Sequence, residues 1–350
     1  MTPKHMRPPS GRSAVFWCLQ HTPWFMALAI IAALVTAVPA FHRSFLWLRL
    51  SQQYFTVAAL ALAMTPIILT GGIDLSVGSV SVFASVVVGA LWRDLGWSIG
   101  AAMLGGVIAA TVAGMLNGLL IVAGVLPLVA TLATRALFRG LALTIGGDRP
   151  VNHFPPGLGE AWRGTWASLP ATLWVLGAFF VLTYIVVHHT WIGRMVYAVG
   201  DNEEAARFAG IPVRPLKLGL YVWSGVVAGV CGIALVMRYD SAKATAEPDL
   251  ELLAITCVVL GGVRITGGFG QVGGTALGII TVCALLSGLG ALHWLGQNWR
   301  STALGALLIS VAICNEACNR WVARRRGALA ASYSAPASDD SQTSTPGVSL

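Results

Sequence analysis

Asp74 is the side chain in this sequence with the clearest chemical potential, because apolar residues enclose its carboxylate within the stretch ILTGGIDLSVGSV (residues 68–80). Gly71 and Gly72 precede it and weaken a helix that arrives from the N-terminal side. A carboxylate in such surroundings can titrate, bind a polar ligand, or cap a new helix by accepting hydrogen bonds from the amides near Ser76. The first two roles are functional and the third is structural, and the sequence leaves both kinds open.

A second glycine-rich stretch, VLGGVRITGGFGQVGGTALG at residues 259–278, repeats this combination of paired glycines and a lone charge between two apolar runs. Its charge is Arg264, and Gly267 and Gly268 form its central pair. The sequence therefore predicts two interrupted helices, one in each half of the chain.

The most polar internal stretch, GRMVYAVGDNEEAARFAGIPV at residues 193–213, predicts a short helix within a loop. Asp201, with Glu204 three positions later, resembles a capping box with Asp in the place of Ser or Thr. Gly210 and Pro212 end the helix about two turns later. One face of this helix carries its apolar residues, Ala205, Phe208 and Ala209. That face either packs on the chain's own helices or is presented to a partner.

Composition places these stretches in a membrane. Hydrophobic residues make up 56% of the 350-residue chain and charged residues only 10%, whereas soluble proteins carry about 25% charged residues. Apolar runs long enough to cross a bilayer recur from Trp24 almost to Cys318, and no alternating pattern typical of a barrel accompanies them. We therefore expect an all-α polytopic membrane protein. The six cysteines include no CxxC pair, so no metal site is expected.

We expect about ten transmembrane helices, within a range of eight to ten. They run over residues 24–41, 54–70, 75–92, 99–122, 126–145, 169–187, 218–237, 252–263, 272–292 and 302–318. The fifth contains Arg135 and Arg139, and the eighth is too short to cross a bilayer alone. The domain organisation is a cytoplasmic segment over 1–23, a transmembrane domain over 24–318 with a cytoplasmic loop at 188–217, and a largely disordered cytoplasmic tail over 319–350.

Basic residues support this topology. They cluster at both termini and in the central loop, and the even numbers of spans between these clusters place all three on the cytoplasmic side. The net charge of +8 is therefore explained by membrane topology, and nucleic-acid binding is not expected.

The two breaks indicate a transport path. Backbone that leaves the helix at membrane depth is tolerated only where it is buried in protein or lines a cavity, and interrupted spans in both halves of a transporter point to the translocation site. One alternative is an ion-coupled carrier that titrates Asp74, although the predicted spans otherwise contain only Glu316 as an acid. The sequence has neither HExxH nor GxSxG, which argues against an enzyme, and it has no GxxxxGK[ST], so an ATP-driven mechanism needs a separate ATPase.

Four stretches together resemble the inner-membrane permease subunits of bacterial ABC importers for ribose and related monosaccharides. They are GGIDLSVGS, PLVATLATRALFRGLAL, GRMVYAVGDNEEAARFAGI and ELLAITCVVLGGVRITGGFGQVGGT, and they follow one another in this order within residues 54–313. The chain departs from the pattern at Cys257, where a small alanine is usual, and in the segment before Glu251, which lacks a glycine-rich approach.

The resemblance implies a multi-pass protein of the bacterial inner membrane with both termini in the cytoplasm. Its implied partners are a second permease subunit, identical or not, a periplasmic sugar-binding protein and a cytoplasmic ABC ATPase. This chain would bind no cofactor, and the ATPase would use the ATP. The coupling element that docks into the ATPase would contain Asp201, Glu203, Glu204, Ala205, Ala206, Phe208 and Gly210.

If the cargo is a sugar, its hydroxyls would meet Asp74, along with Ser76 and Asn117, since polyol ligands suit carboxylate and amide acceptors. The full set of residues expected to line the path is Gly71, Gly72, Asp74, Ser76, Asn117, Arg264, Gly267 and Gly268.

Overall fold

The computed structural model describes residues 44–147, 150–247 and 249–291, together with seven isolated positions, which are Ala32, Thr36, Thr302, Gly305, Ala306, Ile309 and Ile313. The continuous ranges belong to one compact unit, His21–Val311, and the description below concerns that unit. The predicted spans at 24–41 and 302–318 lie outside the described ranges, as do the two terminal segments.

The described part of the unit is built from helices and one short hairpin. The helices are α3 (Ser44–Gln53), α4 (Phe55–Leu69), α5 (Val77–Arg93), α6 (Ile99–Val122), α7 (Pro127–Gly146), α8 (Leu158–Arg163), α9 (Ala171–His189), α10 (Trp191–Asp201), α11 (Glu203–Phe208), α12 (Val213–Tyr239), α13 (Leu250–Leu260) and α14 (Val272–Ala291). Strands β1 (Thr165–Trp166) and β2 (Leu169–Pro170) pair antiparallel.

Five of these helices, α6, α7, α9, α12 and α14, are long and apolar enough to cross a membrane. The prediction of an all-α polytopic membrane protein is confirmed, and the predicted span at 99–122 coincides with α6. The predicted spans at 54–70, 75–92 and 252–263 correspond to the shorter apolar helices α4, α5 and α13. The predicted loop at 188–217 is largely helical, because α10 and α11 occupy it and α12 begins within it.

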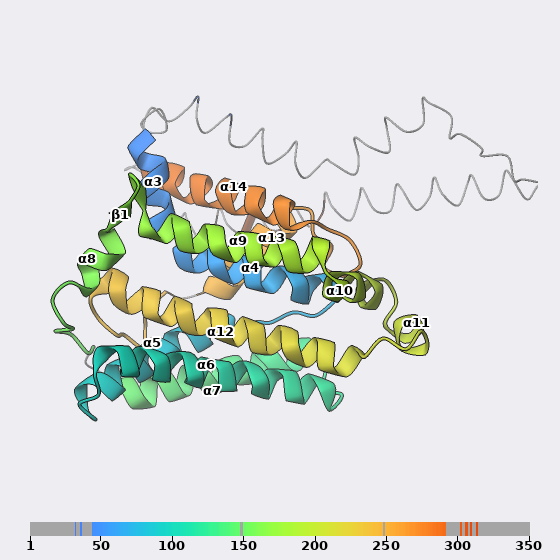
Figure 1. The fold of residues 1–350 in the computed structure, drawn as a ribbon, viewed down its shortest axis with the longest axis horizontal. Helices are drawn as coiled ribbons and strands as arrows, with labels where there is room; N and C mark the ends of the chain where they lie inside the picture. Colours follow the sequence, from blue (N-terminus) through green and yellow to red (C-terminus); the bar gives the residue numbers. More distant parts are fainter. Residues whose placement is uncertain are drawn as a thin grey trace, which may run out of the picture. The chain divides into compact units, whose positions relative to one another are not determined.

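The long helices run alongside one another between two ends of the unit (Figure 1). Helices α10 and α11 lie at one end, and α8 and β1 lie at the other. We call these the α11 end and the α8 end. Helix α4 occupies the interior, since all fifteen of its residues are buried, whereas α6, α7 and α9 expose apolar side chains such as Leu104, Leu132 and Val181.

Two of the helices, α5 and α13, begin inside the bundle. A connector over residues 70–76 separates α4 from α5, and a second connector over residues 240–249 separates α12 from α13. The first turns of the two half-helices touch, because a Cβ added at Gly78 of α5 would lie 2.1 Å from Glu251 Oε2 and 3.2 Å from Leu250 Cβ. Helix α13 is only about 16 Å long, about half the thickness of a bilayer core.

Small residues bring helix backbones into direct contact, as their four-residue spacing predicts. A Cβ added at Gly114 of α6 would lie 2.3 Å from the Tyr221 carbonyl oxygen of α12, and one added at Gly225 of α12 would lie 2.5 Å from the Ala110 carbonyl oxygen of α6. A Cβ added at Gly278 of α14 would lie 2.0 Å from the carbonyl oxygen of Cys257. None of these positions accepts a side chain in the present packing.

Candidate functional site: a buried polar network and an exposed helix

The connector over residues 70–76 is non-helical backbone whose polar groups are satisfied by neighbouring side chains. Gly71 has a φ of 75°, a conformation that glycine adopts without strain. The carbonyl oxygen of Ile73 accepts hydrogen bonds from the hydroxyls of Tyr221 and Thr131, each at 3.3 Å. This is the condition under which irregular backbone persists at membrane depth.

Asp74 ends this connector and is 1% exposed. Its Oδ1 accepts from the amide of Ser76 at 3.0 Å and from the hydroxyl of the same residue at 2.7 Å, while its Oδ2 accepts from the Ser224 hydroxyl at 3.0 Å. Burying a carboxylate is unfavourable unless hydrogen bonds satisfy it. The predicted hydrogen bond with the amide of Ser76 is present, but the N-cap residue of α5 is Ser76 and not Asp74, so Asp74 ties the connector before α5 to α12.

The network continues from Ser76 to α6 and α7. Asn117 Nδ2 donates to Ser76 Oγ at 2.7 Å, and Thr134 Oγ1 donates to Asn117 Oδ1 at 2.6 Å. The structure thus brings together Asp74, Ser76 and Asn117, which the sequence placed in one set. Thr134 and Ser224 complete the network and were not anticipated. Their only signal in the sequence is a hydroxyl within an apolar run.

The Arg264 stretch occupies a different place, at the α11 end. Arg264 stacks on the ring of Phe269 at 5.0 Å, and the amide of Gly268 donates to the carbonyl oxygen of Leu69 at 2.9 Å. A Cβ added at Gly267 would lie 2.7 Å from the amide nitrogen of Gly71. The two predicted breaks therefore meet through their glycines, while Asp74 lies in its own buried network.

Helix α10 closes against this junction through its C-terminal end. A Cβ added at Gly200 would lie 1.9 Å from the carbonyl oxygen of Leu69 and 2.4 Å from the amide of Gly268. Tyr197, one turn earlier, donates to the carbonyl oxygen of Gly270 at 2.7 Å. Burial raises the pKa of Tyr197, so the phenol remains a donor at neutral pH. Helix α10 is therefore in direct backbone contact with the ends of both breaks.

Helix α11 follows and is capped by Asn202. The side chain of Asn202 accepts from the amide of Ala205 at 2.9 Å. The predicted capping role of Asp201 is wrong, because Asp201 is the last residue of α10 and Asn202 is the N-cap of α11. Gly210, with a φ of 82°, follows the end of the helix as predicted.

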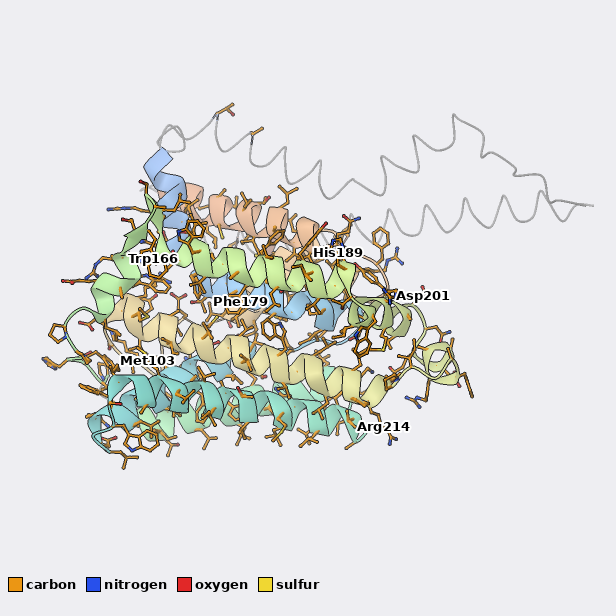
Figure 2. The ribbon with its side chains drawn as sticks, in the orientation of Figure 1. Met103, Trp166, Phe179, His189, Asp201 and Arg214 are labelled. Carbon is orange, nitrogen blue, oxygen red and sulfur yellow. The ribbon has the colours of Figure 1, made fainter. Side chains whose placement is uncertain are left out.

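One side of α11 is anchored and the other is free within the described part of the chain. Glu203 pairs with Lys217 of α12 at 2.7 Å and with Arg207 at 3.2 Å, and Ala206 is buried. Phe208, by contrast, is 87% exposed. Glu204, Ala205 and Ala209 are exposed beside it. Figure 2 shows Asp201 and Arg214 at this end of the unit. Of the two roles open for this helix, the arrangement favours presentation to a partner.

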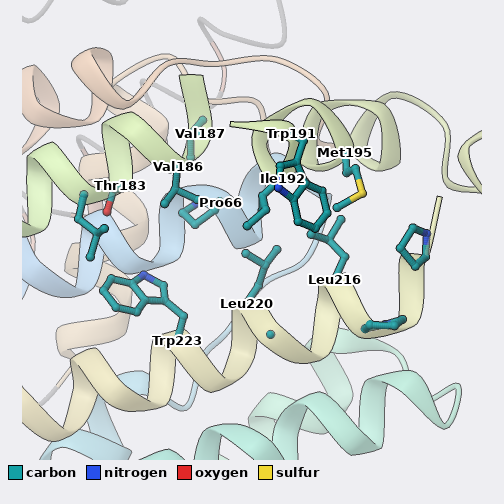
Figure 3. A pocket seen from close by; sticks show the side chains of 14 residues that line it. Pro66, Thr183, Val186, Val187, Trp191, Ile192, Met195, Leu216, Leu220 and Trp223 are labelled. Atoms are coloured by element: carbon teal, nitrogen blue, oxygen red, sulfur yellow. The ribbon is translucent and has the colours of Figure 1, made fainter. Parts of the chain in front are cut away.

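An apolar cavity of about 440 Å³ lies among α9, α10 and α12 (Figure 3). Its walls include Pro66, Val186, Trp191, Leu216 and Trp223. Such a lining offers few partners to a hydroxyl-rich ligand, so the polar network is the better candidate for a site. Among the residues that the structure describes, no three His, Cys, Asp or Glu side chains gather in a metal-binding arrangement.

Comparison with known proteins agrees with this geometry. Residues 53–312 match the family described as branched-chain amino acid transport system / permease component. The ribose import permease protein RbsC of Bacillus subtilis is 37% identical over 272 residues, which cover 77% of this chain and 84% of that protein. The protein of the same name from Escherichia coli is 34% identical over 312 residues, covering 86% and 95%. The autoinducer 2 import system permease protein LsrD of Yersinia enterocolitica is 32% identical over 294 residues, covering 80% and 88%. No solved structure is significantly similar to the chain.

Proposed function

This chain belongs to the family of transport-system permease components, and on that premise we propose that it imports a monosaccharide, ribose or a related sugar, across the bacterial inner membrane. It is a transport subunit of an ABC importer and not an enzyme. The choice of sugar is supported by the two ribose import permeases that are 37% and 34% identical to it.

The observation that carries the proposal is α11. The side chain of Phe208 is 87% exposed, which is unfavourable for a large apolar group in water. Such exposure is typical of a residue that a partner protein covers. Glu203 anchors the helix to α12 through Lys217, and α10 contacts the ends of both breaks through Gly200. A protein that moves α11 therefore also moves the connectors.

In this proposal the partner at α11 is a cytoplasmic ABC ATPase, so the α11 end faces the cytoplasm together with both termini. Residues 24–318 form the permease domain and residues 188–217 its coupling segment. A second permease subunit completes the path, and a periplasmic sugar-binding protein delivers the cargo at the α8 end.

Sugar passes between the connectors once the Asp74 network opens. The Asp74 carboxylate, the Ser76 hydroxyl and the Asn117 amide, once released from one another, then become available to hydroxyl groups of the cargo. The glycine junction of Gly71 and Gly267 forms the cytoplasmic end of this path.

A reconstituted importer tests the proposal. The chain, its ATPase and its binding protein are placed in proteoliposomes, and uptake of radiolabelled ribose is measured with and without ATP. Glu204→Arg is expected to abolish uptake and to release the ATPase, because it reverses a charge on the exposed docking helix. Glu204→Asp, which keeps the negative charge at the same exposed position, is the matched control and should transport normally.

The result that contradicts the proposal is normal uptake by Glu204→Arg. A protonophore separates the proposal from an ion-coupled carrier. Uptake that stops with the protonophore but continues without ATP would assign the chain to the carrier class and make Asp74 its titrating group.

A further inference from the structure

A small polar cavity lies where the half-helices α5 and α13 begin. Its volume is about 90 Å³, and its walls include Ser79 of α5, Arg135 and Arg139 of α7, and the acids Glu247, Asp249 and Glu251. None of these residues was among those predicted to line a path. Arg135 and Arg139 were visible in the sequence only as charges that disturb the fifth span.

The position of the two arginines places the cavity near the middle of the membrane. Arg135 and Arg139 lie about 12 and 18 Å along α7, a helix about 30 Å long. Charged side chains at this depth are unfavourable against lipid, and they face a bundle interior or a water-filled path. The cavity is lined by two arginines and three acids, so its surroundings are strongly polar at this depth.

The charges are only partly satisfied by one another. Arg135 lies 3.1 Å from Asp249 Oδ1, and its Nε lies 2.7 Å from Glu251 Oε1. That Oε1 atom is buried, yet no described group donates to it with hydrogen-bond geometry, Arg135 included. Glu247 pairs with Arg238 instead, at 3.0 Å. Glu251, which is 2% exposed, thus carries a buried acceptor that Arg135 neutralises by charge without a hydrogen bond, so its hydrogen-bonding capacity is left for a ligand in the cavity.

The cavity also has an open side. The side chains of Arg135 and Asp249 are 36% and 60% exposed, although they lie at the depth where lipid would surround a single subunit. A surface with these charges is therefore one that water or another protein covers. A ligand in an aqueous path reaches Glu251 from this side.

The backbone reinforces the polarity of the cavity. The N-terminal ends of α5 and α13, which carry partial positive charge, both begin here, and Gly78 leaves the space that Glu251 fills. An Asp-Leu pair also stands at both helix starts, with Asp74-Leu75 shortly before α5 and Asp249-Leu250 across the beginning of α13. Broken helices that meet with their N-termini at mid-membrane are a common construction of substrate sites in transporters.

We propose that this cavity holds the sugar in transit, which rests on the function proposed above. As the sugar enters, Arg135, Asp249 and Glu251 exchange their mutual ion pairs for hydrogen bonds to its hydroxyl groups. A neutral polyol suits this site because each hydroxyl both donates to a carboxylate and accepts from a guanidinium, and because it adds no charge at mid-membrane.

The volume of the cavity indicates which conformation of the site the structure shows. A volume of about 90 Å³ is below the roughly 300 Å³ at which small-molecule sites begin, so the structure shows the site closed. The exposed pair of Arg135 and Asp249 is the wall that moves to admit the sugar, since its separation breaks one ion pair and no helix.

Asp249→Asn and Glu251→Gln test the site, because each keeps the shape of the side chain and removes its charge. In the reconstituted importer, kcat/KM for ribose is expected to fall at least about tenfold in each, the scale of a hydrogen bond to a charged group. Asp94→Asn, at the α8 end, removes an ion-paired aspartate outside the cavity and is the matched control.

Deoxyribose isomers distinguish contact with the sugar from a structural role. At saturating binding protein, the rate penalty for a missing hydroxyl should be smaller in Asp249→Asn than in the wild type for at least one isomer. Wild-type kcat/KM in both variants, or equal penalties for every isomer in variant and wild type, would overturn the inference. Failure of the proposed function would look different, because the wild type itself would then import no ribose with ATP.

Discussion

Replacing Gly200 by alanine places a methyl group into the contact that joins the coupling segment to the two breaks. The added Cβ would lie 1.9 Å from the carbonyl oxygen of Leu69 and 2.4 Å from the amide nitrogen of Gly268. The hydrogen bond between these same two groups, 2.9 Å long, crosses the contact. The groups that face the added methyl group are all backbone atoms, so no flexible side chain can move aside to make room.

The size of the effect follows from this geometry. The backbones must separate by roughly 1 Å, an overpacking that costs about 1–3 kcal/mol. The buried hydrogen bond between Gly268 and Leu69 is lost as well, at about 1–3 kcal/mol. Together these give a destabilisation of roughly 2–6 kcal/mol, which lowers Tm by about 3–8 °C in a chain of this size.

Transport should respond more strongly than stability. Because α10 reaches the ends of both breaks through this contact, a displaced α10 no longer moves the connectors when the partner ATPase hydrolyses ATP. We expect ribose uptake per ATP hydrolysed to fall severalfold in proteoliposomes, beside the lower Tm in detergent. Gly177→Ala in α9 is the matched control, since no heavy atom lies within 4 Å of the added Cβ and alanine favours the helix.

Two outcomes would refute this reasoning. A Gly200→Ala protein with wild-type Tm would show that the backbones are not in contact. A protein with lowered Tm but unchanged uptake per ATP would show that the contact stabilises the fold and does not transmit movement.

Replacing Asn202 by alanine removes the cap of α11 and should destabilise that helix by about 1 kcal/mol, so uptake falls while Tm of the bundle is unchanged; wild-type uptake would mean that the partner itself orders α11. Asp74→Leu leaves the Ser76 amide and the Ser224 hydroxyl without their acceptor, at about 1–3 kcal/mol each, and should lower Tm and the yield of folded protein. Asp74→Asn keeps an acceptor oxygen for Ser76, so the variant should import ribose even in the presence of a protonophore. A variant with normal Tm that has lost ribose uptake would favour ion coupling.

The helices that cross the membrane could be predicted because hydropathy alone selects them, as the match of α6 to residues 99–122 shows. The elements that were missed, α3, α8, α10 and the hairpin, lie where polar and apolar residues mix and contacts with other segments decide the structure. Helix α10 is an example. A Cβ added at Gly193 would lie 1.8 Å from the Val187 carbonyl oxygen, so the turn from α9 depends on a close approach that no local pattern reveals.

The same limit applies to the candidate sites. Asp74 and Asn117 could be grouped from sequence because strongly polar side chains are rare in apolar runs. Ser224 could not, since a serine in a membrane helix commonly bonds to its own backbone. The pairing of Arg135 with Asp249 was out of reach, because it requires the second connector to fold back from the end of α12 to the middle of the unit.

The glycine contacts between α6 and α12 determine which parts of the subunit can move. Gly114 and Gly225 bring the two backbones into contact. Sliding one helix along the other would make main-chain atoms clash, so the two helices move as one rigid body. The connectors on either side are held by hydroxyl groups and ion pairs, which exchange partners without any covalent or helical change. In a transport cycle α6 and α12 therefore stay fixed relative to each other, and the connectors before α5 and α13 act as hinges. The amplitude of the motion is set by how far α5 and α13 rotate relative to this helix pair.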